Sequence, residues 1–140
     1  MIVYADTSAL AKLLLVEEGT AEMQAKVSAA TTVTCAAIGY VELRAALAAA
    51  IRHGRVPPAS RDEVRRVLER QWTRILEITL DEPLLRDAGD LAERMGLRAY
   101  DAVHLAGLRE SGMPGEVNFA CWDANLRRAA EQLGYSLVPG

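Results

Sequence analysis

Residues 1–10 read MIVYADTSAL, an apolar run followed by an acidic residue and two hydroxyl residues. The segment 2–5 has the length and composition of a buried strand. Leucines recur at helical spacing over 10–14, and the sequence EEG at 17–19 marks the expected end of that helix. The stretch therefore predicts a strand that runs directly into a helix, with Asp6 at the junction.

The same alternation of short strand-like and longer helical segments continues along the chain. Further strands are predicted at residues 31–35, 76–79 and 117–121. Helices are predicted at residues 20–29, 37–53, 62–74, 81–95, 100–110 and 124–133. Strands separated by helices are joined by right-handed crossovers and therefore run parallel. We expect an α/β fold, a three-layer sandwich with a central parallel sheet flanked by helices, and one domain over residues 1–140.

The composition of the 140 residues restricts the class of protein. About half of them, 51%, are hydrophobic, which is enough for a single core. No apolar run is long enough to span a bilayer and no signal peptide is recognisable, so we expect a soluble cytoplasmic protein. The net charge of −3 argues against a protein that holds nucleic acid mainly by a large positive surface. Cys35 and Cys121 lack the spacing of a zinc site and are expected to be buried reduced thiols.

Four carboxylates fall at informative places in this layout. Asp6 and Asp123 each follow a predicted strand, Asp101 lies in the first turn of a helix, and Glu42 lies on an otherwise apolar helical face. The carboxyl ends of parallel strands form the edge where ligands bind in such sheets. Carboxylates brought together there repel one another, and a shared divalent cation is the natural compensation. Ligation by oxygen alone points to Mg²⁺ or Mn²⁺.

Three of these acids also have a simpler explanation. Asp6, Asp101 and Asp123 each lie near the start of a helix, where a carboxylate caps the backbone or complements the helix dipole. Glu42 has no such function, because a carboxylate in the middle of a helix among apolar side chains is costly to bury unpaired. The joint placement of the four acids carries the inference.

Several short motifs in this chain resemble those of one family of nucleases. They are Asp6-Thr7-Ser8-Ala9 after the first strand, Glu42 in the following helical unit, Tyr100-Asp101-Ala102-Val103-His104-Leu105, and Trp122-Asp123-Ala124-Asn125-Leu126. In order and spacing, over essentially the whole chain, they resemble the motifs of PIN-domain ribonucleases. The length resembles in particular the VapC branch, whose members are toxins of toxin–antitoxin pairs.

The resemblance implies a catalytic site and its chemistry. Asp6, Glu42, Asp101 and Asp123 are the implied ligands of Mg²⁺ or Mn²⁺, and RNA is the implied substrate. In a two-metal scheme one ion activates a water molecule and the other stabilises the leaving oxygen, so no side-chain base is required. The products would carry a 5′-phosphate and a 3′-hydroxyl. A protein antitoxin that restrains the enzyme and a homodimer formed through apolar helical surface are also implied.

Polar neighbours of the acids are candidates for supporting roles. Thr7 and Ser8 could hydrogen-bond a metal-bound water or the phosphate, although capping of the helix explains Ser8 equally well and Thr7 better. His104, three residues after Asp101, could orient that side of the site, but a hydrogen-bonded core histidine is the simpler interpretation. Related sequences tend to place a hydroxyl residue where this chain has Cys121, a poorer donor, which makes Asp123 the least certain of the four acids.

The arginines divide into two groups. Arg44, Arg52, Arg127 and Arg128 are on elements near the acids and are the better candidates for contact with RNA phosphates. The helix at 62–74 also presents several arginines, but Asp62 with Arg66 and Arg65 with Glu69 have the spacing of ordinary ion pairs on a solvated face. Ser60 and Glu63 have the spacing of a capping box at the start of that helix.

Two other classes of protein compete with this interpretation. Receiver domains and aspartate-nucleophile phosphatases also place acids and Mg²⁺ at strand ends. The chain has Ser8 where such a phosphatase has a second aspartate, and it has neither the paired N-terminal acids nor the late lysine of a receiver. The second alternative is a catalytically silent domain of the same fold that acts in binding or assembly. Loss of metal binding would favour it.

Overall fold

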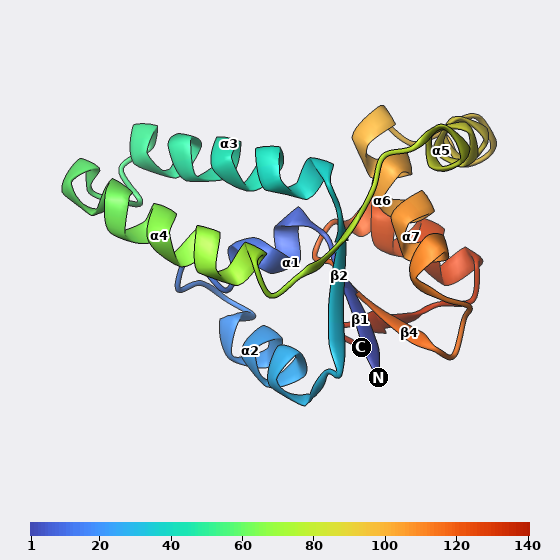
Figure 1. Cartoon of the computed structure of the whole chain (residues 1–140), viewed down its shortest axis with the longest axis horizontal. Coiled ribbons are helices and arrows are strands. Elements are labelled where there is room, and N and C mark those ends of the chain that lie inside the picture. The colour runs from blue at the N-terminus through green and yellow to red at the C-terminus, as the bar shows by residue number, and fades with distance from the viewer.

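Five short parallel strands form the centre of the molecule. The computed structural model describes residues 1–140 and arranges the strands in the order β3-β2-β1-β4-β5 (Figure 1). Their bounds are β1 Ile2–Ala5, β2 Thr32–Ala36, β3 Leu76–Ile78, β4 Val117–Ala120 and β5 Ser136–Val138. The register pairs Ala5 of β1 with Ala120 of β4 and Tyr4 with Thr34 of β2. The predicted central parallel sheet is confirmed.

Seven α-helices and one 3₁₀ turn connect the strands. Their bounds are α1 Thr7–Ala11, α2 Thr20–Ala29, α3 Ile38–Arg52, the 3₁₀ turn Pro58–Ser60, α4 Arg61–Trp72, α5 Glu82–Met95, α6 Ala99–Ser111 and α7 Ala124–Gln132. Helices α3 and α4 lie side by side and extend away from the sheet, while α5, α6 and α7 gather at the opposite end (Figure 1). None of the helices is long and apolar enough to cross a membrane.

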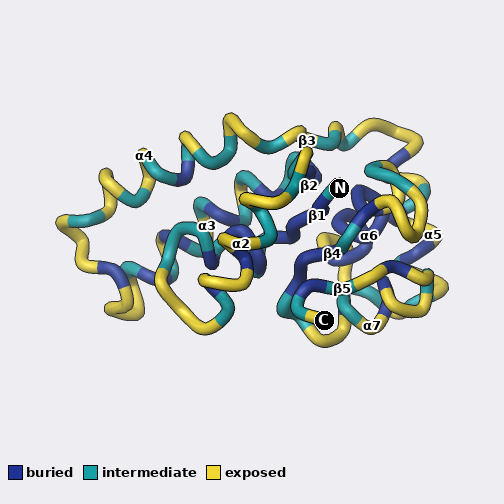
Figure 2. Tube along the Cα trace, turned by 90° about the horizontal axis from the view of Figure 1, so that it is seen from below, coloured by how far each residue is buried: buried dark blue, intermediate teal, exposed yellow.

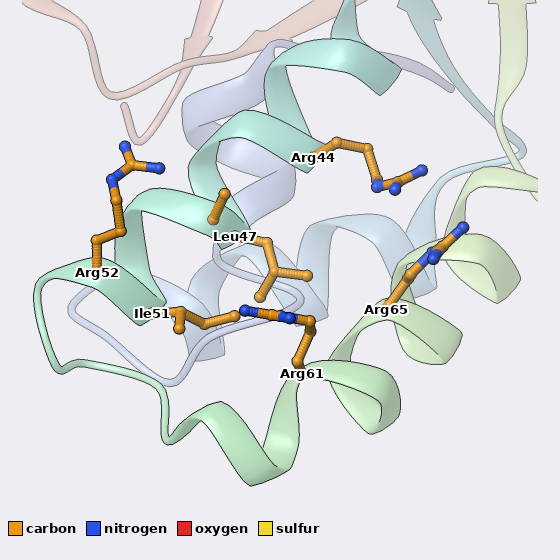
Figure 3. A pocket seen from close by; sticks show the side chains of 7 residues that line it. Arg44, Leu47, Ile51, Arg52, Arg61 and Arg65 are labelled. Atoms are coloured by element: carbon orange, nitrogen blue, oxygen red, sulfur yellow. The ribbon is translucent and has the colours of Figure 1, made fainter.

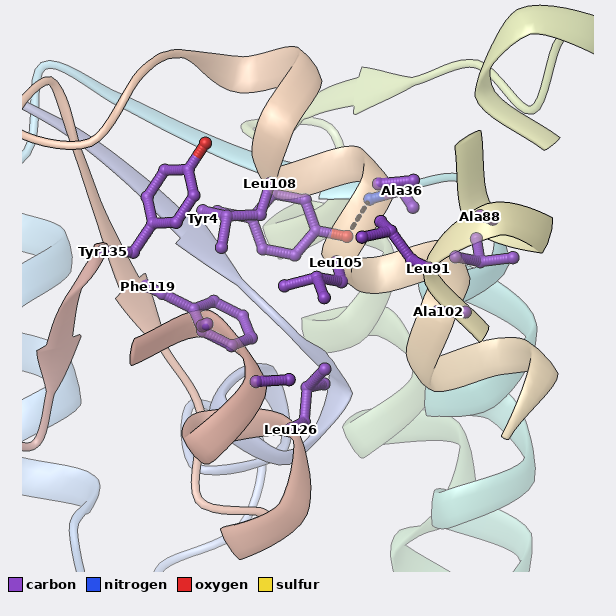
Figure 4. Close-up of a cluster of buried hydrophobic side chains, with 14 of the residues drawn as sticks. Tyr4, Ala36, Ala88, Leu91, Ala102, Leu105, Leu108, Phe119, Leu126 and Tyr135 are labelled. Carbon is purple, nitrogen blue, oxygen red and sulfur yellow. Dashed lines mark hydrogen bonds between the residues drawn. The ribbon is translucent and has the colours of Figure 1, made fainter. Parts of the chain in front are cut away.

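The sheet buries both of its faces. Successive residues of a strand point to opposite sides, and in β1 Tyr4 belongs to one core cluster while Val3 and Ala5 belong to another. The first cluster joins the sheet to α5, α6 and α7 (Figure 4), and the second joins it to α1 through α4. This double burial explains why β1 reads as a continuous apolar run and confirms the three-layer sandwich. The buried strands lie at the centre in Figure 2, and exposed residues line the outer side of α4.

Both cysteines are buried and neither forms a disulfide, as the sequence predicts. Three predictions about helix ends and surface ion pairs are wrong, and one strand was missed. Helix α1 ends at Ala11, earlier than predicted. The leucines at 13–15 lie in turns and a bend instead of a helix, and their side chains pack between α1 and the α3–α4 pair. The strand β5 was not predicted, since three residues are too few to show a period and only pairing with β4 orders them.

The other two errors concern α4. Ser60 makes no capping hydrogen bond, because it ends a 3₁₀ turn in a helical conformation instead of the extended one that a cap requires. The expected ion pairs of Asp62 with Arg66 and of Arg65 with Glu69 are absent; Glu69 instead lies 4.0 Å from Arg44 of α3.

Candidate active site

The strand ends bring the predicted acids to one edge of the sheet. Asp6 directly follows β1, and its backbone N–H donates to the carbonyl of Ala120 at the end of β4, 3.1 Å away. Asp123 lies three residues beyond Ala120 and opens α7. Glu42 lies in α3, which begins two residues after β2, and Asp101 lies in the first turn of α6. The adjacency of β1 to β2 and β4 therefore explains why residues far apart in sequence meet here.

Asp6 is a buried carboxylate with several hydrogen-bond donors. Its Oδ1 accepts from the hydroxyl of Ser8 at 2.6 Å and from the N–H of Ala9 at 3.0 Å, and its Oδ2 accepts from the thiol of Cys121 at 3.0 Å. Burial raises the pKa of Asp6, although the charge of His104 and these hydrogen bonds partly counteract it. Asp6 therefore also caps α1, as its simpler explanation predicted. Capping occupies Oδ1 alone.

The donors to Asp6 are themselves fixed in position. Ser8 accepts a hydrogen bond from the N–H of Trp122 at 2.9 Å, which joins the start of α1 to the loop after β4. Burial, followed by the charge of Asp6, raises the pKa of the Cys121 thiol, so it remains protonated and donates. Cys121 therefore orients Asp6, and it also accepts from the N–H of Asp123 at 3.3 Å.

Glu42 ends a buried chain of hydrogen bonds. Its Oε1 accepts from the Thr7 hydroxyl at 2.9 Å and from Nε2 of His104 at 2.5 Å. Burial raises the pKa of Glu42, but the hydrogen bond and charge of His104 and the bond from Thr7 outweigh it, so that the pKa lies below its ordinary value. Thr7 makes no cap of α1, and its interpretation as a capping residue is wrong.

His104 is held from behind by Tyr4. Nδ1 of the imidazole lies 2.8 Å from the Tyr4 hydroxyl, which also accepts from the N–H of Ala36 at 3.0 Å. The lowered pKa of Glu42 keeps its carboxylate ionised and able only to accept, so Nε2 carries the hydrogen that reaches it, while Nδ1 and the Tyr4 hydroxyl share the second hydrogen bond of the ring. His104 is therefore a buried, hydrogen-bonded core histidine, as the simpler interpretation predicted. The same side chain also orients Glu42. Nothing in the sequence indicated this use of Tyr4.

Asp101 and Asp123 share a cation that sequence reasoning missed. Nε of Arg98 donates to Oδ2 of Asp101 at 3.1 Å, and another guanidinium nitrogen lies 3.9 Å from Oδ2 of Asp123. The hydrogen bond and charge of Asp101 raise the pKa of Arg98. Asp123 caps α7 through Oδ1, which accepts from the N–H of Leu126 at 2.9 Å, so its Oδ2 is free to face Arg98. The signal available in the sequence was an arginine three residues before Asp101 at a helix start.

These contacts connect all four acids. Thr7 follows Asp6 and contacts Glu42, Cys121 links Asp6 to the backbone of Asp123, and Arg98 links Asp123 to Asp101. In the arrangement observed, no three acidic, histidine or cysteine side chains are close enough to share one ion. The donors nevertheless fit a hard divalent cation: every acid offers carboxylate oxygen, and Arg98 already places positive charge between two of them.

The four arginines predicted to contact phosphate do not touch these acids. Arg127 donates to the carbonyls of Cys121 and Pro139 at 2.9 and 2.7 Å and so fixes the loop after β4 to the C-terminus. Arg128 contacts Asn125 on the surface. Arg44 donates to Tyr40, and Arg52 lines a groove between α3 and α4.

A three-layer α/β domain with four linked carboxylates at the carboxyl edge of its sheet has the layout of a metal-dependent enzyme acting on phosphate esters. Comparison with known proteins identifies the family. Residues 3–131 match the model of the PIN domain, and the chain belongs to that family.

Two relatives and several solved structures are similar over most of this chain. Ribonuclease VapC45 and ribonuclease VapC49, from two strains of Mycobacterium tuberculosis, are each 35% identical over 138 residues, which cover 99% of this chain and 95% of theirs. The fold is shared with PAE2754 from Pyrobaculum aerophilum, at a TM-score of 0.73, 19% identity and coverage of 99% of this chain and 85% of that one.

Two further structures share the fold at lower identity. The sarcin-ricin loop cleaving toxin VapC20 of M. tuberculosis has a TM-score of 0.67 and 17% identity, with coverage of 91% of this chain and 94% of that one. A toxin–antitoxin complex from Klebsiella pneumoniae has a TM-score of 0.59 and 16% identity, with coverage of 86% of both chains.

Proposed function

We propose that this protein is a divalent-metal-dependent endoribonuclease and the toxin of a toxin–antitoxin pair. The observation that carries the proposal is the network joining Asp6, Glu42, Asp101 and Asp123 at one edge of the sheet. Membership of the PIN family and 35% identity to two ribonucleases over nearly the whole chain support it.

The four acids are the proposed ligands of Mg²⁺ or Mn²⁺. A bound divalent cation supplies a neutralising charge for the phosphodiester and lowers the pKa of a water molecule. The chain's own residues prepare the oxygens: Ser8 and Cys121 hold Asp6, while Thr7 and His104 hold Glu42. Arg98 has to give up Asp101 and Asp123 for a cation to reach them.

The proposed substrate is RNA, cut by water rather than by its own 2′-hydroxyl. No histidine or lysine side chain is free to act as a base beside the acids, since both ring nitrogens of His104 are already hydrogen-bonded, one to Glu42 and the other to Tyr4. Hydrolysis by water leaves a 5′-phosphate and a 3′-hydroxyl. A 2′,3′-cyclic phosphate on the products would contradict this mechanism.

Two partners are proposed with this function. The first is a protein antitoxin, supported by the shared fold of the Klebsiella pneumoniae toxin–antitoxin complex. The second is another copy of this chain, supported by three large apolar side chains that the helices expose: Val41, Leu85 and Tyr100. Val41→Glu should shift the mass measured by light scattering from dimer to monomer. Val16→Glu, at an exposed valine outside the helices, should not.

The decisive experiment is cleavage of total RNA by purified protein with Mg²⁺ or Mn²⁺ or with EDTA, followed by mapping of the product ends. Asp101→Asn should abolish cleavage, because it removes a ligand that accepts no backbone hydrogen bond and caps no helix. Asp81→Asn, a change of the same type at the cap of α5, should cleave normally. A folded wild type that binds Mn²⁺ but cleaves no RNA would favour the binding or assembly domain instead.

A further inference from the structure

The charges of this acidic protein are unevenly distributed. Residues 38–72, which span α3 and α4, contain seven arginines and four acidic residues, a net charge of +3, although the whole chain carries −3. One of those acids, Glu42, belongs to the candidate active site. The α3–α4 pair is thus a basic projection on an otherwise acidic molecule.

Four of these arginines line one groove. Arg44 and Arg52 extend from α3, Arg61 and Arg65 extend from α4, and Leu47 and Ile51 lie between the helices (Figure 3). The groove has a volume of about 300 Å³, and no acidic residue lines it. Arg52, Arg61 and Arg65 form no ion pair, and Arg44 has only Glu69 at 4.0 Å. The positive charges of the arginines in the groove are therefore largely unneutralised by acidic side chains.

We propose that this groove binds the phosphate backbone of the RNA substrate at a distance from the cleaved bond, an inference that rests on the proposed function. Glu42 and Arg44 are two residues apart, which turns a helix by roughly 200°. Arg44 accordingly faces Tyr40 and α4, whereas Glu42 faces Thr7. The groove is a separate surface that contacts a second part of the same RNA.

The spacing of the arginines favours a chain of phosphates over a single anion. Arg61 and Arg65 are one turn apart, roughly 6 Å along α4, and Arg44 and Arg52 are roughly 12 Å apart along α3. Guanidinium groups suit phosphate oxygens because their donors form a planar fork. The apolar residues between the rows form a wall of low dielectric constant, which strengthens the attraction.

The test measures binding of a fluorescein-labelled single-stranded RNA of about a dozen nucleotides by anisotropy, in EDTA so that no cleavage occurs. The double variant Arg61→Gln/Arg65→Gln should weaken binding at least about tenfold at about 0.1 M salt. The slope of log affinity against log salt should become shallower by about 1.4, the value for two lost contacts with single-stranded phosphates. The matched control, Arg86→Gln/Arg94→Gln, removes two exposed arginines from α5 and should bind like wild type.

Three outcomes would overturn the proposal. The first is equal binding by wild type and the groove variant, and the second is an equal loss in the α5 control, which would show only a dependence on net charge. The third is a groove variant that binds RNA normally but loses its protein antitoxin, because the groove would then be a protein interface. Cleavage of total RNA with Mn²⁺ by wild type tests the proposed function separately, so the two failures are distinguishable.

Discussion

Arg98 and Asp101 form a hydrogen-bonded ion pair at the start of α6, with Nε of the guanidinium 3.1 Å from Oδ2 of the carboxylate. The same guanidinium reaches Asp123 at 3.9 Å and stacks over Tyr100 at 4.9 Å. The chain thus supplies its own cation to two of the acids proposed as metal ligands. A divalent cation and Arg98 compete for these carboxylate oxygens.

Arg98→Ala should therefore bind Mn²⁺ a few-fold more tightly than wild type, as measured by calorimetry. The reason is that no guanidinium has to be displaced from Asp101 and Asp123. Arg86→Ala is the control, since Arg86 pairs with Glu82 on the exposed side of α5. Unchanged or weaker Mn²⁺ binding by Arg98→Ala would show that the pair does not oppose the metal.

Tyr4→Phe should reduce both stability and RNA cleavage. The change removes the hydroxyl that accepts from Ala36 and is hydrogen-bonded to His104, and an unsatisfied buried group costs roughly 1–3 kcal/mol. Cleavage should fall because His104 no longer holds Glu42 in place. Tyr135→Phe removes a hydroxyl bonded to Gly112, outside the acid network, and should leave cleavage intact. Urea unfolding and initial cleavage rates would measure the two effects, and normal cleavage by Tyr4→Phe would contradict the positioning role.

Gly107→Ala tests the same chain of hydrogen bonds from α6. A Cβ at Gly107 would lie 2.9 Å from the Tyr4 hydroxyl oxygen and 3.0 Å from its ring, so the buried Tyr4 would have to move. We expect a loss of roughly 1–3 kcal/mol in the free energy of unfolding. Gly89→Ala, also inside a helix but facing open space, should instead stabilise by up to about 1 kcal/mol. Equal effects of the two changes would mean that the close approach to Tyr4 is not limiting.

Asp6→Asn should raise the melting temperature in EDTA at neutral pH by a few degrees. Burial raises the pKa of Asp6, so the folded state binds this proton more tightly than the unfolded state does. The stabilisation of the folded state by this proton is fully present below the ordinary aspartate pKa. It is lost as the pH rises through the higher pKa that Asp6 has in the folded protein. Asparagine does not ionise and so keeps this stabilisation at neutral pH. The gain in melting temperature of Asp6→Asn over wild type should therefore shrink in acid.

Calorimetric melting of Asp6→Asn at several pH values checks this prediction. Added Mn²⁺ should stabilise wild type and have little effect on the variant, because only the wild type offers the ionised carboxylate. Asp81→Asn changes another helix cap, and it should show neither the gain at neutral pH nor the altered response to Mn²⁺. A lower melting temperature for Asp6→Asn at neutral pH would indicate that its hydrogen bonds outweigh its burial.

The sequence by itself determined the fold class and the candidate acids. Apolar strands separated by helices permit only a parallel sheet with two buried faces, and a carboxylate directly after a strand has to lie at the edge where that strand ends. Asp6 and Asp123 were predictable for this reason. Glu42 was predictable because an acidic residue on an apolar helical face requires a partner.

Tertiary structure decided which side chains serve those acids and where the free arginines gather. Tyr4, His104 and Glu42 lie far apart in sequence, and only the packing of α6 on β1 and of α3 on α1 joins them by hydrogen bonds. The α4 arginines appeared to belong to local ion pairs, yet the approach of α3 drew Glu69 to Arg44. Local spacing shows which contacts a helix permits, whereas the neighbouring elements determine which of them form.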